Sequence, residues 1–248
     1  MNFIKRLIPN KLKQEGKYFL QNLLKIPYTR SGVPLEILNL IPKNRAITFF
    51  DIGANVGHFS TSMAAEYRIK KAILAEPVSR LIPILEEKFS DKSVFKILNV
   101  AISDSAGEVD FYLDEDAHFI SSLLRIDNKG EELVYMNFRD PVLTKVLTLT
   151  LDQIMIQQQL EAIDLLKIDV QGAEHLVLQG GIEALKRTKV IYTEFSFKPV
   201  YKGSSVFFDL YKFLYDHDFI LTNISPGFTS KSGELLQGDA TFVNKKIL

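Results

Sequence analysis

Short apolar segments alternate with segments of helical periodicity from residue 47 to the C-terminus, and this alternation limits the fold more than any other feature. Strands that are apolar along their whole length are typical of parallel sheets, in which helices cover both faces. The segments of strand length are residues 47–52, 72–75, 94–102, 163–168, 190–195, 219–224 and 240–243. The pattern predicts an α/β fold with a seven-stranded, mostly parallel sheet.

Helix candidates lie between most of these strands, because apolar residues recur there at helical spacing. Phe59, Met63 and Tyr67 show this spacing, and we expect further helices at residues 81–89, 174–185 and 206–215. The last two strands are separated by a loop that is rich in Pro, Gly and Ser and too polar for a helix that crosses the sheet. We therefore expect them to form a C-terminal antiparallel hairpin.

The N-terminus lies outside this alternation. Residues 1–30 contain seven basic residues and one acidic residue, with apolar residues between them at helical spacing, so we expect one or two basic amphipathic helices. They form either a helical cap, packed on the main domain or on a second subunit of a homodimer, or a peripheral contact with an anionic membrane. The predicted organisation is a helical appendage at residues 1–45 and a main domain at residues 46–248.

Composition excludes several classes of protein. The chain has no cysteine, which removes disulfide scaffolds and thiolate metal sites. Its 30 basic and 30 acidic residues do not fit a strongly basic nucleic-acid binder. No uncharged run approaches the roughly 18 residues of a membrane-spanning helix, and the N-terminus lacks the pattern of a signal peptide. We expect a soluble, cytoplasmic protein.

Residues 107–151 interrupt the alternation. Val109, Phe111 and Leu113 alternate as in a strand, and residues 146–151 have the character of another strand. The stretch between them is polar. We expect an insertion beside the sheet that acts as a lid over a substrate.

The first strand ends in a turn that carries glycines at Gly53 and Gly57 and leads into a helix. Gly53 suits a tight turn, and Gly57 would let a ligand approach the start of the helix. The second strand ends at Glu76 and Pro77, so a carboxylate follows Gly53 by 23 residues, where an acid can accept both hydroxyls of a ribose.

The end of the third strand and the composition of the first turn indicate which class of ligand fits this edge of the sheet. Asn99 and the backbone of Ala101 are candidates for the edge of an adenine. Asn55 stands where a dinucleotide fingerprint has its second glycine, and Asp51 suits a cationic amino-acid ligand better than a pyrophosphate. The pattern favours an adenosine ligand without phosphates, such as a sulfonium cofactor.

The sequence resembles the FkbM family of S-adenosylmethionine-dependent methyltransferases. The resemblance lies in residues 50–57, 76–77, 99–104, 150–152, 165–174 and 192–194, and the segment 167–174 is its most specific part. It implies a class I methyltransferase (Rossmann-like) fold, S-adenosylmethionine as cofactor and methyl transfer to oxygen. It also implies that Asp51, Gly53 and Gly57 line the methionine end of the cofactor and that Glu76 holds the ribose. Gln171 departs from the family, whose members commonly have glutamate there.

The second half of the chain supplies the candidate catalytic residues. Lys167 and Asp169 alternate along the fourth strand and Glu194 ends the fifth, so we expect the two acids to converge on one cleft. Three roles stay open for them: a general base, ligands of a divalent cation such as Mg²⁺, or structural partners of Lys167. His58 and His118 are alternative bases.

These observations leave two classes of function. The first is an O-methyltransferase that acts on a hydroxyl of a sugar, a glycan or a natural product, with no nucleic-acid partner. The second is a nucleotide-dependent oxidoreductase of the NAD type, or a binding protein that keeps the fold without the chemistry.

Overall fold

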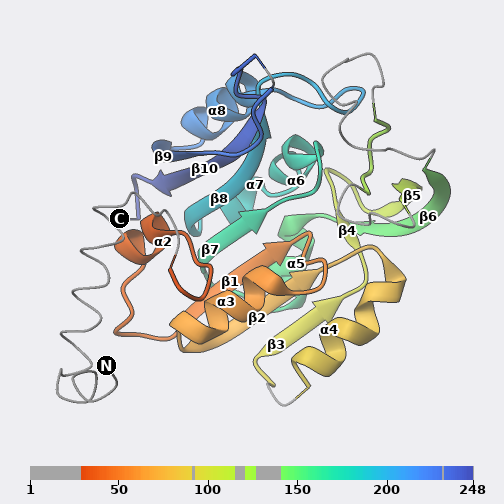
Figure 1. The fold of residues 1–248 in the computed structure, drawn as a ribbon. Helices are drawn as coiled ribbons and strands as arrows, with labels where there is room; N and C mark the ends of the chain where they lie inside the picture. Colours follow the sequence, from red (N-terminus) through yellow and green to blue (C-terminus); the bar gives the residue numbers. More distant parts are fainter. Residues whose placement is uncertain (1–28, 91–92, 115–120, 127–140, 231, 248) are drawn as a thin grey trace, which may run out of the picture.

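A seven-stranded sheet forms the centre of the protein (Figure 1). The computed structural model describes residues 29–90, 93–114, 121–126, 141–230 and 232–247. In spatial order the strands are β3 (Phe95–Leu98), β2 (Ile69–Ala75), β1 (Ile47–Ile52), β7 (Ile163–Ile168), β8 (Thr188–Ser196), β10 (Gln237–Asn244) and β9 (Phe219–Pro226). The pairs among the first five are parallel, and β10 is antiparallel to both neighbours. This confirms the predicted sheet and its C-terminal hairpin.

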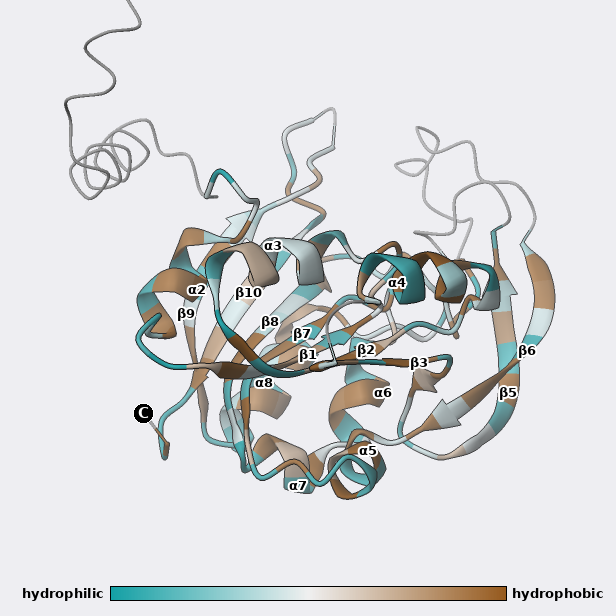
Figure 2. Cartoon of the chain, turned by 90° about the horizontal axis from the view of Figure 1, so that it is seen from below, coloured by the Kyte–Doolittle hydropathy of each residue, from teal (hydrophilic) through white to brown (hydrophobic). Residues whose placement is uncertain are grey.

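Helices cover both faces of the sheet, as predicted (Figure 2). All six residues of β1 are buried, and they alternate: Phe49 packs on one face and Phe50 on the other. The face of Phe49 carries α2 (Leu35–Leu40), α3 (His58–Glu66) and α4 (Ile82–Lys88), the last preceded by the short 3-10 helix η2 (Ser79–Leu81). The face of Phe50 carries α5 (Leu151–Gln157), α6 (Glu174–Gln179), α7 (Ile182–Leu185) and α8 (Phe207–Asp216).

The prediction of a single strand at residues 94–102 is wrong, because this stretch contains two strands of different sheets. The main-sheet strand β3 ends at Leu98, and the chain then enters β4 (Ala101–Ile102), which belongs to a second sheet of order β4-β6-β5. The break falls at Asn99, whose side-chain amide donates to the carbonyls of Glu76 and Pro77 and so ties the chain to the end of β2. The other strands of the second sheet are β5 (Gly107–Leu113) and β6 (Val142–Leu149).

Two further boundaries differ from the prediction. The strand expected at residues 146–151 stops at Leu149, because Thr150 caps α5 through a hydrogen bond that its side chain accepts from the Gln153 amide. The helix expected at residues 174–185 is two helices, since it breaks at Gly180 and Gly181, and glycine is a poor helix former.

The part of the N-terminal region that the structure describes packs on the main sheet. Val33, Ile37 and Ile41 are buried in the same core as α3, and the Tyr67 hydroxyl donates to the carbonyls of Ile37 and Ile41. The basic segment predicted at residues 1–30 lies almost wholly outside the described residues. Within the described ranges, no helix has the length and apolar character needed to cross a membrane.

Candidate active site

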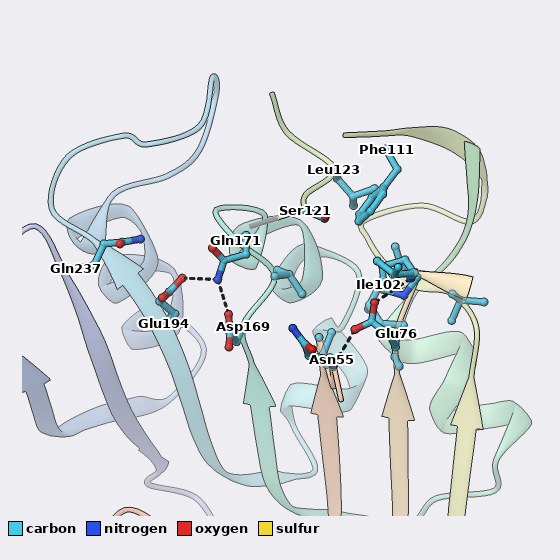
Figure 3. A pocket seen from close by; sticks show the side chains of 18 residues that line it. Asn55, Glu76, Ile102, Phe111, Ser121, Leu123, Asp169, Gln171, Glu194 and Gln237 are labelled. Carbon is cyan, nitrogen blue, oxygen red and sulfur yellow. Dashed lines mark hydrogen bonds between the residues drawn. The ribbon is translucent and has the colours of Figure 1, made fainter. Parts of the chain in front are cut away.

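A cavity of about 240 Å³ opens at the carboxyl ends of β1, β2, β7 and β8 (Figure 3). One end is apolar, where Ile102, Phe111 and Leu123 line the wall, and the opposite end carries Gln171 and Glu194. Ligands of open α/β sheets collect at this edge. Leu123 and its neighbour Ser121 come from the insertion, whose residues 115–120 and 127–140 lie outside the described part, so the lid stays a prediction.

The turn after β1 depends on Gly53, as predicted. Its φ of +75° is in the left-handed region, and a Cβ atom there would lie 1.9 Å from the carbonyl oxygen of Asp169. Only glycine therefore lets the ends of β1 and β7 approach each other this closely. Asn55 follows with a φ of +50°, and both Gly53 and Asn55 line the cavity.

Gly57 lies away from the cavity. Its φ is +77°, and a Cβ atom would come within 2.9 Å of the side chains of Leu85 and Phe89. Gly57 lines neither this cavity nor the second cavity beside it, which is lined by Phe59 and Tyr192. The contact of position 57 with Leu85 and Phe89 thus explains why glycine is needed there, and the approach of a ligand to the start of α3 stays a prediction.

Glu76 is 5% exposed and lines the cavity beside Pro77. Its carboxylate accepts hydrogen bonds from the backbone amides of Asn55, at 2.8 Å, and Val78, at 2.9 Å. Burial raises the pKa of Glu76 above its usual value, although both hydrogen bonds act in the opposite direction. A carboxylate that accepts two hydrogen bonds keeps lone pairs for a ligand.

Of the two residues expected at an adenine edge, only Ala101 lines the cavity. The amide group of Asn99 is already engaged. Its nitrogen donates to Glu76 and Pro77, and its oxygen accepts from the Ser79 hydroxyl at 2.8 Å. The expectation for the Asn99 side chain is therefore not met, because this amide shapes the turn after β2.

Asp51 is completely buried beneath the turn, so it does not face a ligand as expected. Its carboxylate accepts a hydrogen bond from the Ser60 hydroxyl at 2.6 Å and lies 3.1 Å from the ammonium of Lys167. Lys167 also donates to the carbonyl oxygen of Gly53 at 2.8 Å. Burial alone would lower the pKa of Lys167, but Asp51 and Asp169 together raise it, so this side chain stays charged and is not a general base.

Asp169 and Glu194 converge on one end of the cavity, as predicted (Figure 3). Gln171 bridges them: its Nε2 donates to Asp169 Oδ1 at 2.8 Å and to Glu194 Oε2 at 3.2 Å. Asp169 Oδ2 lies 3.5 Å from the ammonium of Lys167. Burial, followed by the charge of Asp169, raises the pKa of Glu194 well above its usual value.

A second cavity, of about 460 Å³, shares Gly53, Asn55 and Asp169 with the first. The stacked rings of Phe59 and Tyr192 belong to its lining. Its other lining residues include His58 and Asp239.

Of the two histidines predicted as alternative bases, one lines the second cavity. His58 is exposed and lines this cavity but not the first, and His118 lies outside the described residues. No motif in the sequence marks Asp239 as a site residue, because it lies within the C-terminal hairpin. Burial is the main cause that raises its pKa to about 6.

Two other residues near the acids, Tyr201 and Gln171, were not predicted as site residues from the sequence. Tyr201 lies 30 positions after Gln171, yet its hydroxyl donates to Gln171 Oε1 at 3.1 Å. Gln171 itself stood out only as a departure from a family pattern. Within the described ranges, no group of three or more His, Cys, Asp or Glu side chains is arranged to hold a metal ion.

The chain is similar to a known protein family and to individual methyltransferases. The family model described as "Methyltransferase FkbM domain" matches residues 51–221. The 2-O-methyltransferase NoeI of Sinorhizobium fredii (strain NBRC 101917 / NGR234) is 31% identical over 198 residues, which cover 77% of this chain and 80% of that protein. Methyltransferase sdnD of Sordaria araneosa is 30% identical over 166 residues, 58% of this chain and 63% of that protein.

Solved structures share the fold at low sequence identity. Methyltransferase FkbM from Methylobacillus flagellatus KT aligns with a TM-score of 0.53 and 12% identity, over 83% of this chain and 45% of that one. A putative S-adenosylmethionine dependent methyltransferase from Listeria monocytogenes aligns with a TM-score of 0.50 and 10% identity, over 85% of this chain and 97% of that one. Both likenesses concern the fold alone.

Proposed function

Since the chain belongs to the FkbM methyltransferase family and is a methyltransferase, we propose that it transfers the methyl group of S-adenosylmethionine to a hydroxyl of a sugar, a glycan or a natural product. The relative NoeI, named a 2-O-methyltransferase, supports oxygen as the acceptor atom. The family does not favour the alternative of an NAD-type oxidoreductase.

One observation carries the proposal: a single cavity joins an apolar end, the buried carboxylate of Glu76 and the acids Asp169 and Glu194. These residues fit the cofactor. An adenine ring needs apolar walls, a ribose needs an acceptor for its hydroxyls, and a cation is stabilised near carboxylates. When bound, S-adenosylmethionine supplies the methyl group on a positively charged sulfur.

Each part of the cavity then has a role in binding. Glu76 accepts hydrogen bonds from the ribose hydroxyls, while the amides of Asn55 and Val78 keep its carboxylate in place. Ala101 and Phe111 lie in the apolar part that would receive the adenine. The close contact at Gly53 fixes the turn beside these groups.

Asp169 is the proposed general base. It lines both cavities, so a hydroxyl in either one can reach it. Asp169 would take the proton of the acceptor hydroxyl while the hydroxyl oxygen bonds to the methyl carbon; the bond between that carbon and the sulfur would break, and the sulfur would leave as a neutral thioether. General bases of this kind contribute about 10²–10⁴-fold to rate. Lys167, charged and fixed by Asp51, orients Asp169 from below. His58 stays the alternative base for an acceptor in the second cavity.

Calorimetry tests the cofactor assignment. We expect S-adenosylmethionine and S-adenosylhomocysteine to bind the full chain and NAD not to bind. Binding of NAD alone would reject the proposal. The acceptor would then be found by incubating cell extract with the protein and radiolabelled S-adenosylmethionine, and by identifying the labelled product.

Two proposals concern the N-terminal segment, whose residues 1–28 lie outside the described part. Its positive charge supports a peripheral contact with anionic membranes, and its apolar residues support a helical cap in this chain or a homodimer. Flotation with anionic liposomes would compare the full chain with a chain that starts near Val33. Equal flotation would favour the cap.

A further inference from the structure

We propose that the side-chain amide of Gln171 takes the place of a divalent cation between Asp169 and Glu194, so that this methyltransferase works without a metal ion at these acids. The inference rests on the proposed function. Two carboxylates at the ends of neighbouring strands are the start of a cation site. In this chain, however, hydrogen-bond donors already occupy the positions that a cation would need.

Both oxygens of Asp169 face positive or partly positive groups. Oδ1 lies 2.8 Å from Gln171 Nε2, and Oδ2 lies 3.5 Å from the ammonium of Lys167. The same amide nitrogen lies 3.2 Å from Glu194 Oε2. A Mg²⁺ ion binds carboxylate oxygens at about 2.0–2.1 Å, so it would have to displace the amide, and the buried ammonium beside Asp169 would repel it. The residues present do not fit a divalent cation.

Contacts outside the acids hold the amide in this orientation. The Tyr201 hydroxyl donates to Gln171 Oε1 at 3.1 Å, which leaves the nitrogen for the acids. The Ser122 hydroxyl donates to the backbone carbonyl of Gln171 at 2.7 Å. Gln171 has a φ of +56°, a left-handed conformation that is uncommon for a residue with a side chain and that collects at functional sites.

The two acids that the amide joins differ in their surroundings. Burial, followed by the charge of Asp169, raises the pKa of Glu194 well above its usual value, while Asp169 Oδ1 accepts the shorter of the two hydrogen bonds from Gln171 Nε2. Gln171 is therefore a positioning residue, because it acts on the acceptor through Asp169. An amide cannot take up this proton itself.

Gln171→Glu tests the inference, because it replaces the amide by a third carboxylate. The matched control is Gln157→Glu, which adds the same charge at an exposed position at the end of α5. Full-length proteins saturated with S-adenosylhomocysteine are titrated with MnCl₂, and bound Mn²⁺ is measured by electron paramagnetic resonance. We expect Gln171→Glu to bind Mn²⁺ at least tenfold more tightly than the wild-type protein and the Gln157→Glu control.

Methyl transfer to the acceptor in cell extract gives a second readout. Wild-type transfer should be unchanged when EDTA is added, whereas transfer by Gln171→Glu should fall at least tenfold in EDTA and recover with Mn²⁺. If Gln171→Glu does not fold, Gln171→Ala empties the same position without adding charge, and it should also bind Mn²⁺ more tightly than the wild-type protein.

Two results would overturn the inference. One is a wild-type protein that loses transfer in EDTA or that binds Mn²⁺ in a way that Asp169→Asn abolishes. The other is a folded variant at position 171 that binds Mn²⁺ no better than the wild-type protein. Binding of S-adenosylhomocysteine, measured first, separates the two proposals: its absence rejects the proposed function, whereas its presence with metal-dependent transfer rejects only this inference.

Discussion

The ammonium of Lys167 lies 3.1 Å from the carboxylate of Asp51, and both side chains are buried beneath the turn that follows β1. This ion pair places a fixed positive charge under the cavity and holds Lys167 within 3.5 Å of Asp169. It also means that Asp51 supports the site from within the core, since its side chain is fully buried and lines neither cavity.

Replacing Lys167 by Met should strongly destabilise the protein, because Asp51 would stay buried without its cation. Removal of one partner of a buried ion pair costs about 3–5 kcal/mol. Urea unfolding measures the free energy of unfolding. The control is Lys212→Met, which breaks the exposed pair with Asp216 and should cost about 0.5 kcal/mol or less. Equal losses in both variants would contradict the buried pair.

Glu76→Ala should weaken binding of S-adenosylhomocysteine at least tenfold, a loss of about 1.4 kcal/mol. The variant loses the acceptor of the ribose hydroxyls and the anchor of the Asn55 amide. Glu76→Gln keeps one acceptor oxygen, so its affinity for S-adenosylhomocysteine should lie between that of the wild-type protein and that of Glu76→Ala. Titration calorimetry gives the dissociation constants, with Glu86→Ala on the exposed side of α4 as control. An unchanged constant in Glu76→Ala would show that the ribose lies elsewhere.

Asp169→Asn should lower the rate of methyl transfer at least 100-fold, because the amide cannot accept the proton of the hydroxyl. Affinity for S-adenosylhomocysteine should stay within about threefold of wild type, since the side chain keeps its shape. A transfer assay with labelled cofactor and calorimetry give the two values, and Asp110→Asn on the exposed surface of β5 serves as control. Wild-type rates in Asp169→Asn would leave this residue with a structural role only.

Gly57→Ala should destabilise the protein without weakening cofactor binding. A Cβ atom at this position meets Leu85 and Phe89 at 2.9 Å, and overpacking of this kind costs about 1–3 kcal/mol. Gly203→Ala is the matched control, because Gly203 has a φ of +83° but no atom within 4 Å of the added Cβ. The difference in unfolding free energy between the two variants isolates the contact. A variant that binds the cofactor poorly but unfolds normally would return Gly57 to the ligand site.

Glu174 should make stability depend on pH. Burial raises its pKa to about 7 in the folded protein, from an ordinary value of 4.5. Between these two values the folded state holds a proton that the unfolded state has lost. The contribution of Glu174 is thus complete below pH 4.5 and falls as the pH rises to 7.

This loss is on the order of 3 kcal/mol, because one pKa unit corresponds to about 1.4 kcal/mol. Glu174→Gln should remove it, so the variant should gain stability relative to wild type at pH 8 more than at pH 4. Urea unfolding at both values checks the difference. A constant difference between the two proteins would show that Glu174 ionises normally.

Local patterns in the sequence were sufficient for the sheet and for several site residues. Phe49 and Phe50 are neighbours in a strand, so their side chains point to opposite faces of the sheet. Because β1 is apolar along its whole length, both faces must be covered by helices. Gly53 and Glu76 were predicted because each follows a strand directly, and the carboxyl ends of parallel strands meet at one edge.

At the site, the residues whose surroundings differ from the prediction have partners that lie far away in the sequence. Asn99 was expected at a ligand, but its amide bonds the turn 22 residues earlier. Asp51 was expected to face a cationic ligand, and the ammonium that it meets belongs to Lys167. Gly57 has the motif of a ligand loop, yet the side chains of α4 explain its lack of a Cβ atom.

The sequence by itself determined the fold class, the family and the edge of the sheet where the chemistry lies, because periodicity and short motifs act between neighbours along the chain. Only the tertiary structure decided which polar groups pair. Gln171 reaches Glu194 across 23 residues and Tyr201 across 30 residues, and both contacts depend on how β7 and β8 are packed. Hydrogen bonds and ion pairs act over a few ångströms in space, and no local pattern specifies which distant segments come that close.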